Sequence, residues 1–346
     1  MSRVKWTCVL TVVLLVARGA YAQDREASRW EPFGPAPVDE AGSAGRGYVL
    51  GGDGSDVLQP GVSQLSLHNV FANYFYLENR GDFTISQRFE AHTLALDYQR
   101  GVKVRTWPRL EVSAQLQVHE SDAGILNGFI IGFEDFVHAP LRRTLPEPPP
   151  PGMSIVQNGR MVYQAPINGA GVGDLSLVVK APLRDRDART RATQVALRVA
   201  VNVRGASMFT AGNFIASGLS IDRKMTERVA LHGDVRVSVP LDHVGVWHLP
   251  LKREVLAYSW GSEFRVSHNT SFNVQVDNST SPYHTTGSIG LDANYGNIDL
   301  AVSHRFTASR HHVIAQLYVQ ENMNMPFKVR WNMDPDLTIG LKATIR

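Results

Sequence analysis

Two Ser-His dipeptides are the residues of this sequence that most resemble hydrolytic chemistry, Ser267-His268 and Ser303-His304. A serine activated by a histidine attacks ester bonds, and enzymes built on barrels place such pairs near the outer rim to hydrolyse lipids. Neighbouring residues of a strand point to opposite faces, so neither dipeptide forms a dyad by itself. His119, Ser121 and His138 have no spacing that joins them into a triad. A lipid-modifying enzyme is therefore the weakest of three functional hypotheses.

No pattern in the sequence predicts a metal site or a cofactor. Asp53 and Asp56 lie beside glycines, but their spacing fits no known calcium loop and favours a solvated loop. The glycine-rich stretch 169–173 leads into a predicted strand, whereas a phosphate-binding loop leads into a helix. Three isolated histidines are interpreted as polar groups lining a lumen: His68, His92 and His232.

Charged residues of both signs recur on one face of the predicted strands: Arg88, Glu90, Glu111, Lys180, Arg198, Asp234, Arg236, Glu263, Arg265 and Lys342. We expect this face to point into a barrel with limited internal room, where long side chains can pair across the interior. An unpaired charge there would be costly away from water. The interior is predicted to be either a salt-bridged, mostly closed core or a narrow polar passage.

The strands that must position these charges are visible as long alternating stretches. In Thr193–Arg204 every second residue is β-branched or aliphatic, and the others are small, polar or charged. This period of two gathers the apolar side chains on one face of a strand. The pattern returns at 229–239 and 337–345. A membrane-crossing strand needs about nine to eleven residues, against roughly five or six in a soluble sheet. The sequence predicts an all-β, antiparallel transmembrane β-barrel with apolar residues facing lipid.

About twelve strands are predicted, an even number, as single-chain bacterial barrels require. Their alternating sets begin at Leu65, Phe83, Leu110, Leu175, Thr193, Ile215, Val229, Leu256, Phe272, Ile298, Val313 and Leu337. The second strand is predicted to turn Phe83, Ile85 and Phe89 toward lipid. The stretch 288–291 is assigned to a loop, because a thirteenth strand would break parity.

Connections alternate between short and long, which predicts periplasmic turns at one rim and extracellular loops at the other. The short ones are 184–191, 222–227, 267–271 and 307–311, and the long ones are 119–172, 205–212, 241–254, 277–297 and 321–336. Eight aromatic residues near strand ends are predicted to form girdles at the membrane surfaces: Tyr74, Phe75, Tyr76, Trp107, Tyr258, Trp260, Phe306 and Tyr318.

A secretory signal peptide is predicted over residues 1–22. A basic start is followed by the apolar run 6–17 and by Ala20-Tyr21-Ala22, a small-x-small motif predicted to be cleaved after Ala22. Cys8 lies within this segment, so the mature chain is predicted to form no disulfide and no thiolate metal site. The net charge of +3 equals the three basic residues of the segment, and cleavage leaves 3 − 3 = 0. A neutral mature chain gives no support for nucleic-acid binding.

Two segments do not follow the strand pattern. Residues 23–61, rich in glycine and proline, are predicted to be a periplasmic lead-in, with a position tucked into the barrel mouth as an alternative, and the barrel is predicted over 62–346. The extracellular insertion 120–172 holds apolar residues at helical spacing, which predicts a short helix acting as a lid or packed on the rim. The candidate gate residues are Ile125, Phe129, Phe133 and Phe136. Gln157-Asn158-Gly159-Arg160 predicts a tight hairpin turn.

Several stretches carry a resemblance to a known family: 33–38, 57–61 running into 69–77, 124–143, 171–175, 279–283, and Glu321 before 335–337. In their order, the mature chain resembles an uncharacterised bacterial outer-membrane β-barrel family known only as a domain of unknown function. The resemblance spans nearly all of the mature chain and implies a barrel in the outer membrane. That family has no established activity, so the resemblance implies no site residue.

Three functions follow as hypotheses for a bacterial outer-membrane barrel without a cofactor. The first is passage or binding of a small molecule, with the segment 124–139 as its gate. The second is a structural or partner-docking barrel, and the third is the lipid-modifying enzyme. The expected partners are outer-membrane lipid, the barrel-assembly machinery during insertion and a small-molecule ligand, with no nucleic acid.

Overall fold

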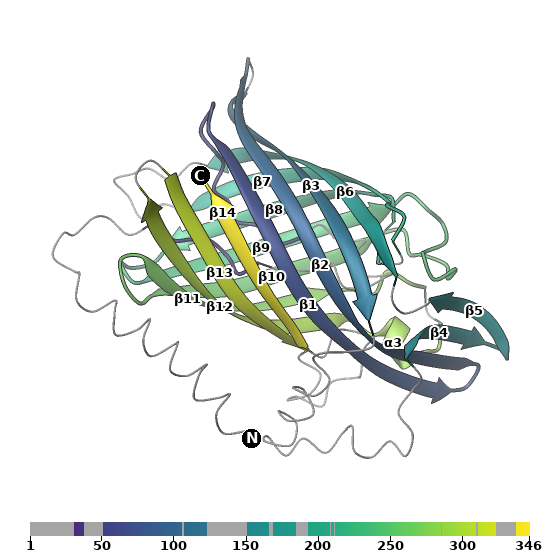
Figure 1. The fold of residues 1–346 in the computed structure, drawn as a ribbon. Helices are drawn as coiled ribbons and strands as arrows, with labels where there is room; N and C mark the ends of the chain where they lie inside the picture. Colours follow the sequence, from purple (N-terminus) through teal and green to yellow (C-terminus); the bar gives the residue numbers. More distant parts are fainter. Residues whose placement is uncertain are drawn as a thin grey trace, which may run out of the picture.

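The computed structural model describes residues 31–37, 51–105, 107–122, 151–165, 169–184, 193–207, 209–210, 212–284, 286–308, 311–322 and 337–346. Twelve of its strands close into one antiparallel barrel, which confirms the predicted fold class (Figure 1). They are β1 (Ser63–Arg80), β2 (Phe83–Val104), β3 (Trp107–Asp122), β6 (Ala170–Arg184), β7 (Gln194–Val203), β8 (Phe214–Lys224), β9 (Val229–Pro240), β10 (Val255–Arg265), β11 (Thr270–Ser279), β12 (Tyr295–Ala308), β13 (His311–Asn322) and β14 (Leu337–Ile345). The barrel closes where β1 pairs with β14, from Leu65 opposite Ile345 to Asn73 opposite Leu337.

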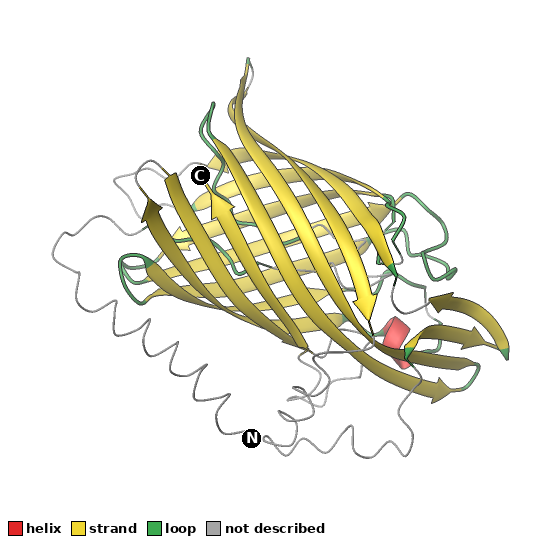
Figure 2. Ribbon diagram, in the orientation of Figure 1, coloured by secondary structure: helices red, strands yellow, loops and turns green. Residues whose placement is uncertain are grey.

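A hairpin and one helical turn complete the described elements (Figure 2). Strands β4 (Gly152–Gln157) and β5 (Arg160–Ala165) extend the sheet from β2 and end it. Asn158 and Gly159 form the predicted turn, with φ angles of 52° and 72°. The stretch near residue 290 is the helix α3 (Ile289–Asp292) and no strand, as parity predicts. Among the described residues, no helix has the length and apolar character to cross a membrane.

The outer face of the barrel is apolar. Val199, Val235 and Leu341 are 46%, 60% and 47% exposed, whereas Arg198 and Arg236 are 2% and 1% exposed and face inward. Apolar residues point out and charged ones point in, as the alternation predicts.

The two rims differ in their connections. Turns at 105–106, 225–228 and 266–269 lie at one end with the C-terminus, which we call the short-turn rim. Connections 241–254 and 280–294 lie at the other end, the long-loop rim, together with α3 and the β4–β5 hairpin (Figure 1). The alternation of short and long connections is as predicted.

An apolar cluster lies inside the barrel at the long-loop rim. Its buried members include Tyr74, Phe89, Phe209, Phe214, Trp247, Leu249, Tyr283 and Leu291. The rings of Trp247 and Tyr283 stack at 5.4 Å. Glu78 fastens α3 to β1, since its carboxylate accepts hydrogen bonds from the Ser288 hydroxyl at 2.7 Å and the Gly290 amide at 3.1 Å.

The faces predicted for the start of β2 are wrong. Phe83, Ile85 and Phe89 are buried on the inner side and belong to this apolar cluster, and Arg88 and Glu90 share the outer face with Leu94 by alternation. The reason is length: β1 and β2 have 18 and 22 residues, and β14 pairs only with residues 65–73 of β1. Beyond that point, the β1–β2 hairpin projects past its neighbours and packs its inner face on the loops.

Two further placements differ from the predictions. His92 lies on the outer face of β2, where its Nε2 is 2.5 Å from the Asn69 Oδ1 and its ring stacks on Phe71. Three predicted girdle residues, Tyr74, Tyr76 and Tyr318, are buried inside the barrel. Four others are exposed on the outside, as expected of a girdle: Trp107, Tyr258, Trp260 and Phe306.

Some predictions fall outside the described residues. These are the signal peptide 1–22 with Ala20 and Ala22, the predicted helix of the insertion, and the candidate gate residues Ile125, Phe129, Phe133 and Phe136.

Candidate functional site

The barrel wall carries a row of ion pairs across its inner face. Arg198 on β7 forms an ion pair with Asp234 on β9, and the Arg236 Nε lies 2.6 Å from the same carboxylate. Arg236 reaches Asp277 on β11 at 3.4 Å. Gly218 lies between the two arginines in the register of β7, β8 and β9. A Cβ there would lie 3.2 Å from Arg236 and 3.5 Å from Arg198, so glycine leaves room for both side chains.

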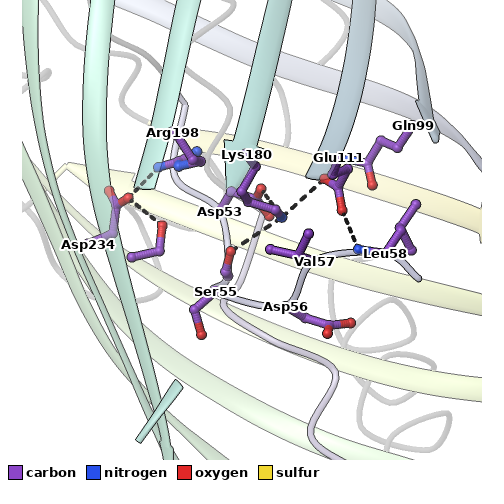
Figure 3. A network of polar contacts seen from close by, with 12 residues as sticks. Asp53, Ser55, Asp56, Val57, Leu58, Gln99, Glu111, Lys180, Arg198 and Asp234 are labelled. Carbon is purple, nitrogen blue, oxygen red and sulfur yellow. Dashed lines mark hydrogen bonds and ion pairs between the residues drawn. The ribbon is translucent and has the colours of Figure 1, made fainter. Parts of the chain in front are cut away.

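A second group of charges reaches from the wall to a segment inside the barrel. The Lys180 ammonium lies 3.2 Å from Glu111 and 2.8 Å from Asp53 (Figure 3). Arg198 donates to the carbonyl of Gly51 at 2.8 Å. Burial alone would raise the pKa of Asp53, but the positive charges of Lys180 and Arg198 outweigh it and hold the pKa below its usual value.

The segment inside the barrel belongs to the N-terminal lead-in and has two described legs. The first leg, residues 31–37, places the Ala36 carbonyl on Gln275 of β11 and packs Ala36 against Val70 and Tyr318. The second leg, residues 51–62, returns to β1, and Leu58 donates to the Glu111 carboxylate at 2.9 Å. Ser55, Val57 and Leu58 are buried. The sequence has no strand periodicity here. Backbone groups of the segment form hydrogen bonds with side chains of the lumen wall instead of with a neighbouring strand.

Three side chains of the wall form a buried cluster next to both legs. His232 on β9 lies between Asp222 on β8, at 2.7 Å from its Nδ1, and Glu263 on β10, at 3.1 Å from its Nε2. A neutral imidazole carries one N–H only, so two carboxylate partners favour the doubly protonated cation.

A cavity of about 560 Å³ separates the segment from the wall at the short-turn end. Its wall residues include Gln64, Gln99, Lys180, Asp222, His232, Gln316, Lys342 and Thr344. Amides, hydroxyls and charges of both signs border this space. It is therefore suited to a small hydrated solute and poorly suited to an apolar one.

Eight of the ten charges predicted to point inward are on the inner face of their strands, and Arg88 and Glu90 at the start of β2 are the two exceptions. Arg198, Asp234, Arg236 and Glu263 are buried, and Lys342 borders the cavity. Arg265 lies at the short-turn rim and donates to the Ser267 carbonyl at 3.2 Å.

The sequence leaves open a position of the lead-in in the barrel mouth, but it predicts none of the contacts that the lead-in makes there. The interpretation of Asp53 as part of a solvated loop is wrong, because its carboxylate pairs with Lys180 inside the barrel. Asp222 was assigned to a turn, although it binds the second leg through Ser55. The available signal was the excess of inward charges, which had no assigned partners.

The two members of the Ser303-His304 pair point to opposite faces of β12. Ser303 is buried inside the barrel and accepts from Gln316, whereas His304 lies on the outer face with its ring on Phe306. His119 points inward at the long-loop rim, with its Nδ1 2.9 Å from the Thr93 hydroxyl. In the part of the chain that the structure describes, no group of three or more His, Cys, Asp or Glu side chains has an arrangement that could hold a metal ion.

Comparison with known proteins gives independent support for the fold. No family model and no curated protein matches the chain, so the family resemblance stays a prediction. Among solved structures, the COG4313 outer membrane channel from Pseudomonas putida F1 aligns over 84% of this chain and 98% of its own, with 11% identity and a TM-score of 0.52. The NanC porin aligns over 81% of this chain and 98% of its own, with 7% identity and a TM-score of 0.43. The KdgM porin aligns over 82% of this chain and 98% of its own, with 5% identity and a TM-score of 0.40. At 11% identity, the alignment with the COG4313 channel establishes a shared barrel fold.

Proposed function

We propose that this protein is an outer-membrane channel for a small polar molecule, with the N-terminal segment limiting passage. The observation that carries the proposal is the polar cavity of about 560 Å³ inside a closed barrel with an apolar exterior. The fold shared with an outer membrane channel supports the proposal and the location.

The lumen chemistry suggests which solutes pass. The wall holds charges of both signs close to neutral amides, so a hydroxylated or zwitterionic solute can exchange its hydrogen bonds with water for bonds to the wall. A strongly apolar solute would gain nothing from these groups and would strip water from them.

The test is conductance of the purified full-length protein in planar bilayers, together with swelling of protein-containing vesicles in polar solutes. We expect small, intermittent currents in the wild type. A matched full-length variant, with residues 31–37 and 51–56 replaced by Gly and Ser at constant length, should conduct more and admit larger solutes. Absence of current in both proteins would reject passage.

Partner docking is the second candidate, supported by the edge of the sheet. Strand β5 ends the sheet beyond the long-loop rim, and among the described strands it has a neighbour on one side only. An unpaired strand edge is a template for adding a strand from another chain. A photo-crosslinker at Val162, compared with one at Val244 on another loop, would test this. Equal yields at both positions would reject strand addition.

A further inference from the structure

The two legs of the N-terminal segment meet at one point of the barrel wall. A Cβ on Gly54 would lie 3.1 Å from the Pro35 ring and 3.2 Å from the Asp222 carboxylate. Residues of the two legs thus touch each other where they touch the wall. Release of either leg would remove a contact surface of the other.

The cluster Asp222, His232 and Glu263 holds both legs at this point. Glu263 accepts from the backbone amides of Phe33 and Gly34, at 3.0 and 3.2 Å, on the first leg. Asp222 accepts from the Ser55 amide at 2.5 Å and from its hydroxyl at 2.7 Å, on the second leg. Hydrogen bonds to an ionised acceptor are about twice as strong as neutral ones.

His232 couples the two carboxylates. Its ring nitrogens donate to both, so each acceptor is oriented by the same imidazolium. The positive ring also offsets the repulsion between two carboxylates that are both directed at the segment. Disturbing one carboxylate therefore disturbs the position of the other.

The remaining polar contacts between wall and segment each reach a single leg within the described residues. Asn273 and Gln275 bind the first leg, through the carbonyls of Gly34 and Ala36. Lys180, Arg198, Glu111 and Arg109 bind the second leg. The cluster is the place where both are held together.

We propose that Asp222, His232 and Glu263 form a latch that holds both legs in the lumen, and that breaking it frees the legs together and opens the passage. This inference rests on the proposed channel function and assigns its control to three named residues. The latch binds mainly backbone amides, which any extended segment offers. What is specific is the position in the lumen at which it holds the segment.

The test compares full-length Asp222→Asn and Glu263→Gln with Asp242→Asn, which alters a carboxylate in a connection at the long-loop rim that bonds to Asn213. Each latch variant should raise the open probability in planar bilayers by about tenfold, the effect expected from losing a charged hydrogen bond. The control should match the wild type. Open probabilities of the latch variants equal to that of the control would overturn the proposal.

A second measurement reports the segment itself. Cysteine placed at Ala36, a buried position, should react with a membrane-impermeant maleimide faster in the latch variants than in the wild type or the control. If Asp222→Asn does not fold, as judged by heat-dependent gel migration, Ser55→Ala removes the same hydroxyl contact and should give a smaller increase. Equal labelling rates would also overturn the latch.

Failure of the latch and failure of the channel give different results. If the Gly-Ser variant conducts while both latch variants behave like the wild type, the latch is rejected and passage stands. If the Gly-Ser variant does not conduct either, passage itself is rejected.

Discussion

At the long-loop rim aromatic and aliphatic side chains such as Trp247 and Phe89 pack together inside the barrel, whereas at the short-turn rim the interior is lined by charges and amides around the N-terminal segment. The stability of this apolar half comes from packing, which keeps water away from the packed side chains. The polar half closes by pairing, and each of its bonds can be exchanged for a bond to water or solute. The polar half is therefore where passage can be controlled at low energetic cost.

Removal of Trp247 should produce the largest loss of stability. Trp247 is 1% exposed and stacks on Tyr283, and truncating a buried tryptophan to alanine costs about 3–5 kcal/mol. Trp247→Ala should lower the urea midpoint of the reconstituted protein, followed by circular dichroism. Trp260→Ala, on the lipid-facing side, is the control and should lose less. Equal losses would show that the apolar half is no packed core.

Weakening the ion-pair row should have the next largest effect. Asp234→Asn leaves Arg198 and Arg236 with a neutral partner, and losing a charged hydrogen bond costs about 1.5–3 kcal/mol. The excess positive charge should shift the reversal potential toward anions. Asp242→Asn, the same change in a connection at the long-loop rim, should leave the reversal potential unchanged. An unaltered reversal potential in Asp234→Asn would place the row off the conduction path.

A smaller effect is expected at Asp53, and it depends on pH. The pKa of Asp53 is held below its usual value when the segment is docked in the lumen. The ionised carboxylate therefore stabilises docking fully above about pH 4, and this stabilisation is lost as pH falls through the lower pKa of the docked state. Wild-type conductance should rise in that acid window. Asp53→Asn should already conduct more at neutral pH and lack this acid step.

Asp56→Asn is the matched control for that pH experiment. Its carboxylate is 60% exposed and pairs with Arg109 and Arg346. Because water screens exposed ion pairs, these two pairs contribute little to holding the segment in place. An acid step of equal size in Asp53→Asn and the wild type would assign the step to another group.

The barrel itself was predictable because alternation is dictated by lipid outside and water inside. Within the membrane-crossing rows, Val199 and Arg198 could only take the faces they have. The same rule fails for Phe89, because β1 and β2 continue beyond the other strands into a region where the inner face meets loops. An alternating pattern shows only that the two faces of a strand differ in polarity. Whether the apolar face is buried or faces lipid depends on what lies next to that part of the strand.

Only part of the candidate site can be predicted from the sequence. The inward charges follow from strand position, but several of their partners on the N-terminal segment are backbone groups, such as the amides of Phe33 and Gly34. A backbone amide has no side-chain signature, so the sequence contains no local sign of these contacts. The glycines and prolines of the lead-in show only that it forms no strand or helix.

The smallest expected effect is at Gly159, in the hairpin beyond the long-loop rim. Its φ of 72° costs a non-glycine residue about 1 kcal/mol, and a Cβ there would meet nothing within 4 Å. Gly159→Ala should speed hydrogen exchange in β4 and β5 about fivefold and leave the urea midpoint of the barrel unchanged. Gly169→Ala, which also meets no atom and has no positive φ, should have no effect. If Gly159→Ala instead lowered the midpoint, the hairpin would unfold together with the apolar half and would have to be counted as part of its core.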